Sequence, residues 1–230
     1  MDSAAHASLT CAASHHCRLR LRFSYHSAMR ELAAFVLAGG KSSRMGQDKA
    51  AIVLGGKTLL ERAIEIAKVA GGGVSIVASG ENTRKFAAQF GLRTIADVLE
   101  GQGPLAGIHA ALESSQAGEL NFILAVDTPF VTAAFVRYIV RRARNSKDTV
   151  TVPRISGRLH PLCAVYRRGF VQSAQAALGE QRNKIEAAID PAALDIINEG
   201  DLAAGGFDPE MFANINTPAD LALAQARLSS

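Results

Sequence analysis

Long apolar runs and cysteines are both scarce in this sequence. No stretch approaches the uninterrupted apolar length that a membrane-spanning helix needs, so we expect no membrane contact. The three cysteines are Cys11, Cys17 and Cys163, an odd number without the spacing of a disulfide framework. This usage is typical of a reduced, cytoplasmic protein. Although His15 and His16 lie between the first two cysteines, no second ligand pair completes a zinc site, and we expect no metal there.

Net charge is also small, and most of it lies at one end of the chain. Of the formal charge of +4, residues 1–30 contribute +3. The charged residues of this segment are Arg18, Arg20, Arg22, Arg30 and Asp2. The remaining 200 residues are therefore close to neutral, which argues against general nucleic-acid binding. A hydrophobic content of 48% indicates a globular protein.

Residues 1–28 lack the periodicity of a folded segment, and a second methionine, Met29, stands just before the first apolar run. The segment is rich in Arg, Ser and Ala and superficially resembles a transit peptide, but it has no apolar core of a secretory signal. We interpret it as an over-long start or a disordered extension. Residues 30–230 contain no repeat or linker and are expected to form a single domain.

The most informative stretch is Phe35–Lys49, which reads FVLAGGKSSRMGQDK. The preceding apolar run, Leu32–Ala38, is short and continuous, as in a strand buried on both faces. Glycines after such a strand allow a sharp turn whose amides form an anion-binding concavity. Arg44 and Lys49 bring positive charge to the same place. The sequence therefore predicts a polyphosphate cradle at the end of the first strand.

Two better-known phosphate motifs do not fit this stretch. Phe35 stands where a P-loop requires its first glycine, and the spacing also fails the dinucleotide fingerprint. The remaining pattern, L-A-G-G-x-S-x-R-M-G-x-D-K, resembles the signature loop of nucleotidyltransferases. Ala38 followed by Gly39 and Gly40 resembles the molybdenum cofactor guanylyltransferase family in particular. The resemblance extends over about residues 33–228.

Strands and helices alternate along the rest of the chain. Strands are expected at 51–54, 74–78, 92–95, 122–126, 149–152, 162–166 and 194–197, and helices at 58–70, 81–90, 104–114, 132–144, 170–178, 182–189 and from Pro218 onward. This rhythm predicts an α/β Rossmann-like three-layer sandwich, with a mostly parallel sheet, helices on both faces and a small hairpin insertion around 149–166. The resemblance implies a fold like that of nucleotide-diphospho-sugar transferases.

Two aspartates follow buried strands directly, where ligands of parallel sheets bind. Asp127 precedes Pro129, and Thr132 is a better cap for the next helix, so we interpret Asp127 as a metal or nucleotide ligand. Asp97 fits either a nucleotide contact or a turn. The resemblance favours the nucleotide contact for Asp97 and assigns magnesium to Asp127.

The resemblance also implies a complete site and a reaction. GMP is transferred from GTP to Mo-molybdopterin with release of pyrophosphate, and Mg²⁺ is the cofactor. The catalytic residues are Arg44, Lys49 and Asp127, with Asp127 as the metal ligand. The nucleotide-binding residues are Leu37, Ala38, Gly39, Gly40, Ser43, Lys49, Asp97 and Asp127. The acceptor-binding residues are Gly107, His160, Asn214 and Asn216. Protein partners would be cofactor-insertion proteins or molybdoenzymes, in transient contact.

One departure and several alternatives accompany this interpretation. The family tends to have an asparagine at the end of its second strand, where this chain has Ala78-Ser79. For His160 a packed or solvated role is an alternative, and for Asn214 and Asn216 an Asx turn before the last helix. Alternative functions are a cytidylyltransferase on the same pterin, another NTP:phosphate nucleotidyltransferase, or a non-catalytic nucleotide-binding accessory protein.

Because residues 1–28 carry no fold pattern, we predict that a chain beginning at Met29 keeps the melting temperature and the activity of the full chain. Differential scanning calorimetry and a turnover assay on both chains test this. A loss of several degrees in the shorter chain would show that the tail packs on the folded body.

Overall fold

The computed structural model describes residues 31–39, 48–97 and 101–229. The predicted site residues Gly40, Ser43 and Arg44, and the N-terminal segment 1–28, lie outside these ranges. Within the described ranges, an eight-stranded sheet has the order β10-β7-β9-β6-β1-β4-β5, and β8 pairs with β7 beside that path. The strands are β1 (Leu32–Leu37), β4 (Gly73–Ala78), β5 (Arg93–Ala96), β6 (Leu120–Ala125), β7 (Val150–Ile155), β8 (Arg158–Leu159), β9 (Cys163–Arg167) and β10 (Leu194–Ile197).

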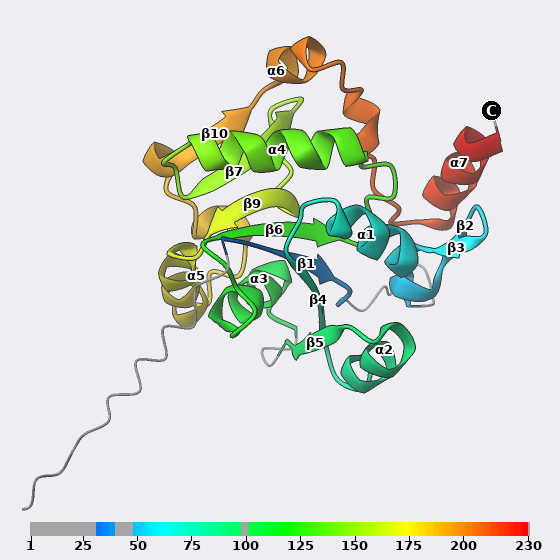
Figure 1. Ribbon diagram of the computed structural model, residues 1–230, viewed down its shortest axis with the longest axis horizontal. Coiled ribbons are helices and arrows are strands. Elements are labelled where there is room, and N and C mark those ends of the chain that lie inside the picture. Colours follow the sequence, from blue (N-terminus) through cyan, green and yellow to red (C-terminus); the bar gives the residue numbers. More distant parts are fainter. Residues whose placement is uncertain (1–30, 40–47, 98–100, 230) are drawn as a thin grey trace, which may run out of the picture.

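Strand directions confirm a mostly parallel sheet. The pairs β1–β4, β1–β6, β4–β5 and β10–β7 are parallel, and on the main path only β9 runs against its neighbours β6 and β7. Helices cover both faces, as the sequence predicts (Figure 1). The helices of the described ranges are α1 (Leu59–Lys68), α2 (Asn82–Phe90), α3 (Pro104–Glu113), α4 (Ala133–Asn145), α5 (Phe170–Gly179), α6 (Glu199–Ala204) and α7 (Pro218–Ser229), of which α7 lies apart from the sheet, beside β2 and β3 (Figure 1).

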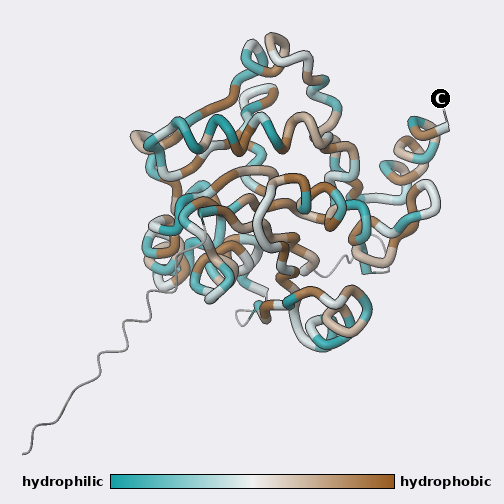
Figure 2. Tube along the Cα trace, viewed as in Figure 1, coloured by the Kyte–Doolittle hydropathy of each residue, from teal (hydrophilic) through white to brown (hydrophobic). Residues whose placement is uncertain are grey.

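Two hydrophobic cores lie on the two faces of the sheet, and alternate residues of β1 supply both of them. Ala34 and Val36 pack with residues of α1 and α4, whereas Phe35 and Leu37 pack with residues of α3 and α5. All six residues of β1 and all six of β6 are buried, and hydrophobic residues concentrate in these central strands (Figure 2). Full burial of a side chain such as Phe35 contributes about 1.5–3 kcal/mol, which fixes β1 at the centre of the fold.

The segment before α1 differs from the predicted strand at 51–54. Lys49–Ala51 forms a 3-10 turn, and within 51–54 the strand is limited to β2 (Val53–Leu54), paired with β3 (Lys57–Thr58). The turn forms because the Asp48 side chain accepts a hydrogen bond from the Ala50 amide at 3.0 Å. A capping box begins α1 next to the start of the helix predicted at 58–70: Thr58 Oγ1 accepts from the Glu61 amide, and the Glu61 carboxylate accepts from the Thr58 amide at 2.7 Å.

The predicted start of the last helix is also confirmed. The Asp220 carboxylate accepts hydrogen bonds from the amides of Asn216 and Thr217, at 2.9 and 2.8 Å. Thr217 Oγ1 accepts in return from the Asp220 amide at 3.2 Å. The hydrogen bond from the Asn216 amide is the largest cause that lowers the pKa of Asp220, and the hydrogen bonds with Thr217 lower it further. The Asp220 carboxylate is therefore ionised at neutral pH. It fixes the backbone of residues 216–217 ahead of α7.

The predicted hairpin around 149–166 exists, but its two arms belong to the central sheet. β7 and β9 pair with each other and with other strands of that sheet, and the protruding part is the short β7–β8 hairpin. The predicted helix at 182–189 is wrong: only Ile185–Ala187 forms a 3-10 turn. The backbone before it closes α5 instead, since the amides of Gln181 and Arg182 donate to the carbonyls of Leu178 and Ala177.

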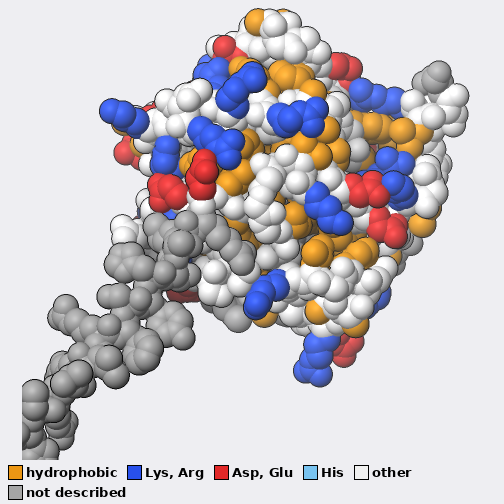
Figure 3. All heavy atoms as spheres, in the orientation of Figure 1, with side chains coloured by type: hydrophobic (Ala, Val, Ile, Leu, Met, Phe, Trp, Pro, Cys, Tyr) orange, Lys and Arg blue, Asp and Glu red, His pale blue; other side chains and the backbone are white. Residues whose placement is uncertain are grey.

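Several surface charges of the described residues are paired locally. On the face shown in Figure 3, basic side chains lie among acidic and neutral ones. Arg142 of α4 bonds Asp195 and Asp201, and Arg144 bonds Glu31. Within the described ranges, no helix combines the length and the apolar character needed to cross a membrane.

Candidate active site

The strand order reverses at β1. The chain runs from β1 outward through β4 and β5, and then returns to β6 on the other side of β1. Ligands of open α/β sheets bind at such a point, outside the carboxyl ends of the strands. A cavity of about 600 Å³ lies there. Its lining residues are Leu37, Ala38, Gly39, Asp48, Lys49, Val77, Ser79, Asp97, Gly101, Gly103, Pro104, Gly107, Ala125, Val126, Asp127 and Leu162.

This cavity brings together all six of the predicted nucleotide-binding residues that the structure describes. Leu37, Ala38 and Gly39 follow β1, and Asp97 follows β5. Lys49 and Asp127 complete the set. The predicted acceptor residue Gly107 lines this cavity too, on the buried face of α3, where an added Cβ would contact the Leu37 side chain at 3.6 Å.

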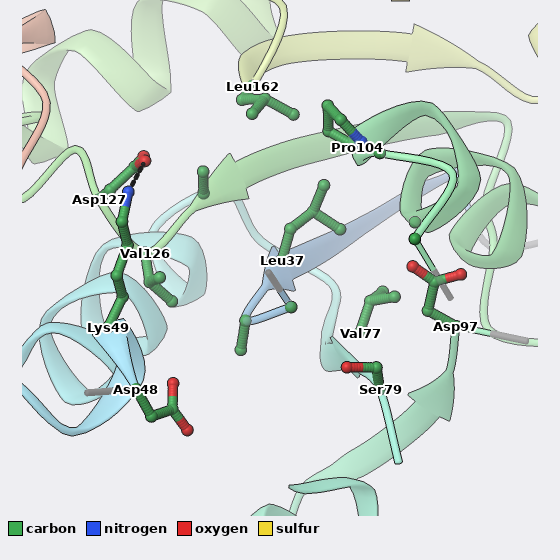
Figure 4. A pocket seen from close by; sticks show the side chains of 16 residues that line it. Leu37, Asp48, Lys49, Val77, Ser79, Asp97, Pro104, Val126, Asp127 and Leu162 are labelled. Carbon is green, nitrogen blue, oxygen red and sulfur yellow. Dashed lines mark hydrogen bonds and ion pairs between the residues drawn. The ribbon is translucent and has the colours of Figure 1, made fainter. Parts of the chain in front are cut away.

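Asp127 is held in place through its own backbone and that of its neighbours. The Val126 amide donates to the Leu37 carbonyl at 3.3 Å, which continues the β1–β6 pairing to the cavity edge. The Ile215 amide donates to the Asp127 carbonyl at 2.9 Å and ties the loop before α7 to this point. Thr128 is buried and donates to the Ala125 carbonyl at 3.0 Å. These bonds leave the Asp127 carboxylate directed into the cavity (Figure 4).

Lys49 forms the central contact of the site. Its Nζ donates to Asp127 Oδ2 at 2.9 Å and to Asn216 Oδ1 at 2.6 Å. The Lys49 and Asp127 side chains are only 20% and 18% exposed, so solvent screens this ion pair weakly. The structure therefore brings two predicted catalytic residues into contact and adds Asn216, which sequence reasoning placed on the acceptor side.

Asp48 was not singled out from the sequence, although it lines the cavity next to Lys49. One carboxylate oxygen caps the turn that carries Lys49, and the other accepts from Asn82 Nδ2 of α2 at 3.2 Å. An aspartate directly before a short helical turn is a recognisable N-cap signal, so the capping role of Asp48 could have been predicted from the sequence. The contact of Asp48 with Asn82 depends on the fold and could not have been predicted in this way.

The two ends of the cavity differ. Asp48, Lys49 and Asp127 lie at one end, and Asp97 and Pro104 lie at the other (Figure 4). Leu37 and Val77 form an apolar floor between them. The cavity thus has polar or charged groups at both ends and an apolar floor between them, a surface on which a ring system can lie. Ser79, at the position where the sequence departs from the family, lines the cavity as well.

A second cavity, of about 420 Å³, adjoins the first and shares Pro104, Asp127 and Leu162 with it. The predicted acceptor residues His160 and Asn214 line it. His160 packs against Phe212 with ring centroids 4.9 Å apart, and burial lowers its pKa, so its imidazole is neutral at pH 7. The other lining residues are Thr128, Arg158, Leu159, Pro161, Cys163, Asn183, Lys184, Ile185 and Glu186, which sequence reasoning did not assign to a site.

The side chains at the junction of the two cavities limit how a divalent cation could be held. Among the described residues, no group of three or more His, Cys, Asp or Glu side chains could hold a metal ion. Asp127 supplies one carboxylate at the charged end of the first cavity. Magnesium is commonly held by one or two carboxylates together with waters and substrate phosphates. The site therefore fits a cation that is coordinated mainly by a bound polyphosphate, and does not fit a cage made by the protein alone.

The chain is similar in sequence to known proteins. Residues 34–192 match the model of the MobA-like NTP transferase domain. The chain is 32% identical to the probable molybdenum cofactor guanylyltransferase of Pelotomaculum thermopropionicum over 86% of this chain and 93% of that protein. It is 35% identical to the protein of the same description from Carboxydothermus hydrogenoformans, over 84% and 94% of the two chains.

A solved structure is similar over nearly the whole described fold. The molybdopterin-guanine dinucleotide biosynthesis protein A from Archaeoglobus fulgidus superimposes with a TM-score of 0.75 at 28% identity. The superposition covers 86% of this chain and 98% of that one.

Proposed function

This chain belongs to the MobA-like NTP transferase family and is a nucleotidyltransferase, and from that premise we propose that it transfers GMP from GTP to Mo-molybdopterin, forming molybdopterin guanine dinucleotide. The observation that carries the proposal is the position of Asp127, which lines both cavities. A transferase that joins two substrates needs a charged group where their reacting phosphates meet. Asp127 stands at that junction.

In this proposal GTP occupies the first cavity. The triphosphate lies at the charged end with Lys49, and the base lies toward Asp97 over the apolar floor of Leu37 and Val77. A carboxylate at the base end suits guanine, whose ring N–H and amino groups are both donors. Gly40, Ser43 and Arg44 belong to the segment outside the described residues, and their phosphate-binding role rests on the sequence pattern alone.

Mo-molybdopterin then occupies the second cavity, with its terminal phosphate at Asp127 and its ring system toward His160 and Asn214. A phosphate oxygen of the acceptor attacks the α-phosphorus of GTP, the new P–O–P bond forms, and the bond to the β-phosphate breaks to release pyrophosphate. The attacking phosphate is already ionised near pH 7, so no strong general base is needed. The neutral His160 is consistent with a packing or hydrogen-bonding role.

The chain's own residues contribute mainly position and charge. Lys49 stabilises the negative charge that develops on the phosphates, and the bonds that hold Asp127 and Asn216 fix the surroundings of that charge. Mg²⁺, held by Asp127 and phosphate oxygens, would neutralise the triphosphate and the leaving pyrophosphate. Such preorganised electrostatics is the main catalytic means in related phosphoryl transfers.

The alternatives are a cytidylyltransferase on the same pterin and another NTP:phosphate nucleotidyltransferase. The family, together with the contact of Lys49 and Asp127 at the cavity junction, argues against a non-catalytic nucleotide-binding protein. We further propose that the reaction takes place in the cytoplasm, and that the product passes to cofactor-insertion proteins or molybdoenzymes by transient contact.

We predict that GTP is used in preference to CTP and ATP. Competitive turnover with equimolar nucleotides and Mo-molybdopterin measures the preference, with the product identified by mass spectrometry. Preferential incorporation of CMP would show that the protein is a cytidylyltransferase.

Asp127 and Lys49 should fail in different ways. Asp127→Asn removes the metal's anionic ligand, so turnover collapses and raised magnesium partly restores it. Lys49→Ala removes a direct phosphate contact and should cost about 3–4 kcal/mol of transition-state stabilisation. This corresponds to roughly a hundred- to a thousandfold in rate. Magnesium should not restore the Lys49 variant. Steady-state pyrophosphate release at several Mg²⁺ concentrations measures both effects.

The two variants need a fold control, because their loss of activity could reflect unfolding. The Asp127 carboxylate lies at a strand end rather than in either hydrophobic core, so circular dichroism should show native spectra for both. Near wild-type turnover in both natively folded variants would show that catalysis takes place at another site.

The β7–β8 hairpin offers a matched pair of arginines for the acceptor cavity. Arg158 lines the second cavity, whereas Arg154, exposed on the same hairpin, lies outside both cavity linings. Arg158→Gln should raise KM for the anionic acceptor about threefold to fivefold, the scale of one exposed charge pair of up to about 1 kcal/mol. KM for GTP should stay unchanged, and Arg154→Gln should change neither constant. Equal effects of the two substitutions would argue against the acceptor in this cavity.

A further inference from the structure

We propose that Lys49 keeps divalent cations off Asp127 in the nucleotide-free enzyme, so that metal and nucleotide enter the site together. The inference rests on the proposed function, because it takes Asp127 as the metal's carboxylate. It goes beyond that function by assigning Lys49 a second role, before the substrate binds, and by making Asn216 a positioning residue for Lys49.

The first step is the contact that Asp127 already makes. Its Oδ2 accepts a hydrogen bond from Lys49 Nζ at 2.9 Å, and both side chains are about four-fifths buried. A cation that binds this carboxylate must therefore approach an ammonium group that is already in contact with it. The two positive charges repel each other, and the low exposure of the pair limits screening by solvent. Binding of a metal alone is thereby disfavoured.

The second step is that Lys49 is not free to move aside without losing a partner. Its Nζ also donates to Asn216 Oδ1 at 2.6 Å. Asn216 is itself fixed, because its amide donates to Asp220, and the neighbouring Ile215 amide donates to the Asp127 carbonyl. At the other end, the Asp48 side chain caps the turn on which Lys49 stands. Lys49 is thus held between two acceptors from distant parts of the chain.

The third step concerns what a nucleotide changes. A triphosphate brings several anionic oxygens into the first cavity, which Lys49 lines together with Asp127. These oxygens give the ammonium a new acceptor and give the metal most of its ligands, so the repulsion at Asp127 is offset. The same lysine therefore excludes the metal before the nucleotide binds and contacts the phosphates afterwards.

Binding of Mn²⁺ to the nucleotide-free protein tests the inference without measuring turnover. Free Mn²⁺ is followed by electron paramagnetic resonance during titration of the full chain. We expect Mn²⁺ to bind weakly to the wild type and at least tenfold more tightly to Lys49→Gln. This substitution replaces the ammonium group with a neutral amide on a slightly shorter side chain. Asn216→Ala should bind Mn²⁺ with intermediate affinity, because it loosens Lys49 without removing the charge.

Two controls make the comparison specific. Lys57→Gln removes a lysine whose ion pair with Glu65 is about half exposed and lies outside both cavity linings, and it should leave Mn²⁺ affinity unchanged. The double variant Lys49→Gln/Asp127→Asn should lose the gain in affinity, which shows that Mn²⁺ binds at Asp127. Adding GTP without acceptor should raise Mn²⁺ affinity in the wild type far more than in Lys49→Gln.

The outcomes separate this inference from the proposed function. Equal Mn²⁺ affinity of wild type and Lys49→Gln without nucleotide, or a gain that persists in the double variant, overturns the role of Lys49. GMP transfer by the wild type would still support the proposed function in that case. A natively folded Lys49→Gln protein that binds Mn²⁺ at least tenfold more tightly than the wild type, and only through Asp127, supports the inference.

Discussion

The pairing of β1 with both β4 and β6 is the constraint on which the site depends. Leu37 lies opposite Val77 on one side and Ala125 on the other, so the three strands end at the same level. The residues that follow them are consequently brought together from distant parts of the sequence. Because β1 is buried on both faces, a shift of register by one residue would exchange the side chains of the two cores. The same burial that stabilises the fold therefore places Asp127 beside the end of β1.

The charges of the site are paired only in part. Lys49 and Asp127 neutralise each other, and Asn216 supplies a further acceptor without adding charge. Asp48 lines the same cavity, and its carboxylate accepts from the Ala50 amide and from Asn82, which are neutral. In the proposed reaction, the phosphates of the substrate therefore supply most of the ligands of the metal.

Much of the fold could be predicted from the sequence because its signals are local. The apolar runs of β1 and β6, the Thr58–Glu61 cap and the Thr217–Asp220 cap each depend on residues within a few positions of one another. The helix predicted at 182–189 failed because the end of α5 uses that backbone. The Lys49–Asn216 bond joins residues 167 positions apart, and no local pattern announces such a contact. For the same reason the lining of the second cavity was mostly missed.

The wall shared by the two cavities, formed by Pro104, Asp127 and Leu162, has a consequence after the chemical step. In the proposed reaction the dinucleotide product keeps its guanine in one cavity and its pterin in the other. A bound product therefore blocks both new substrates at once, and its affinity combines contacts that each substrate makes separately. Product inhibition competitive with both substrates follows from this arrangement, and a downstream acceptor that withdraws the product would speed the whole cycle.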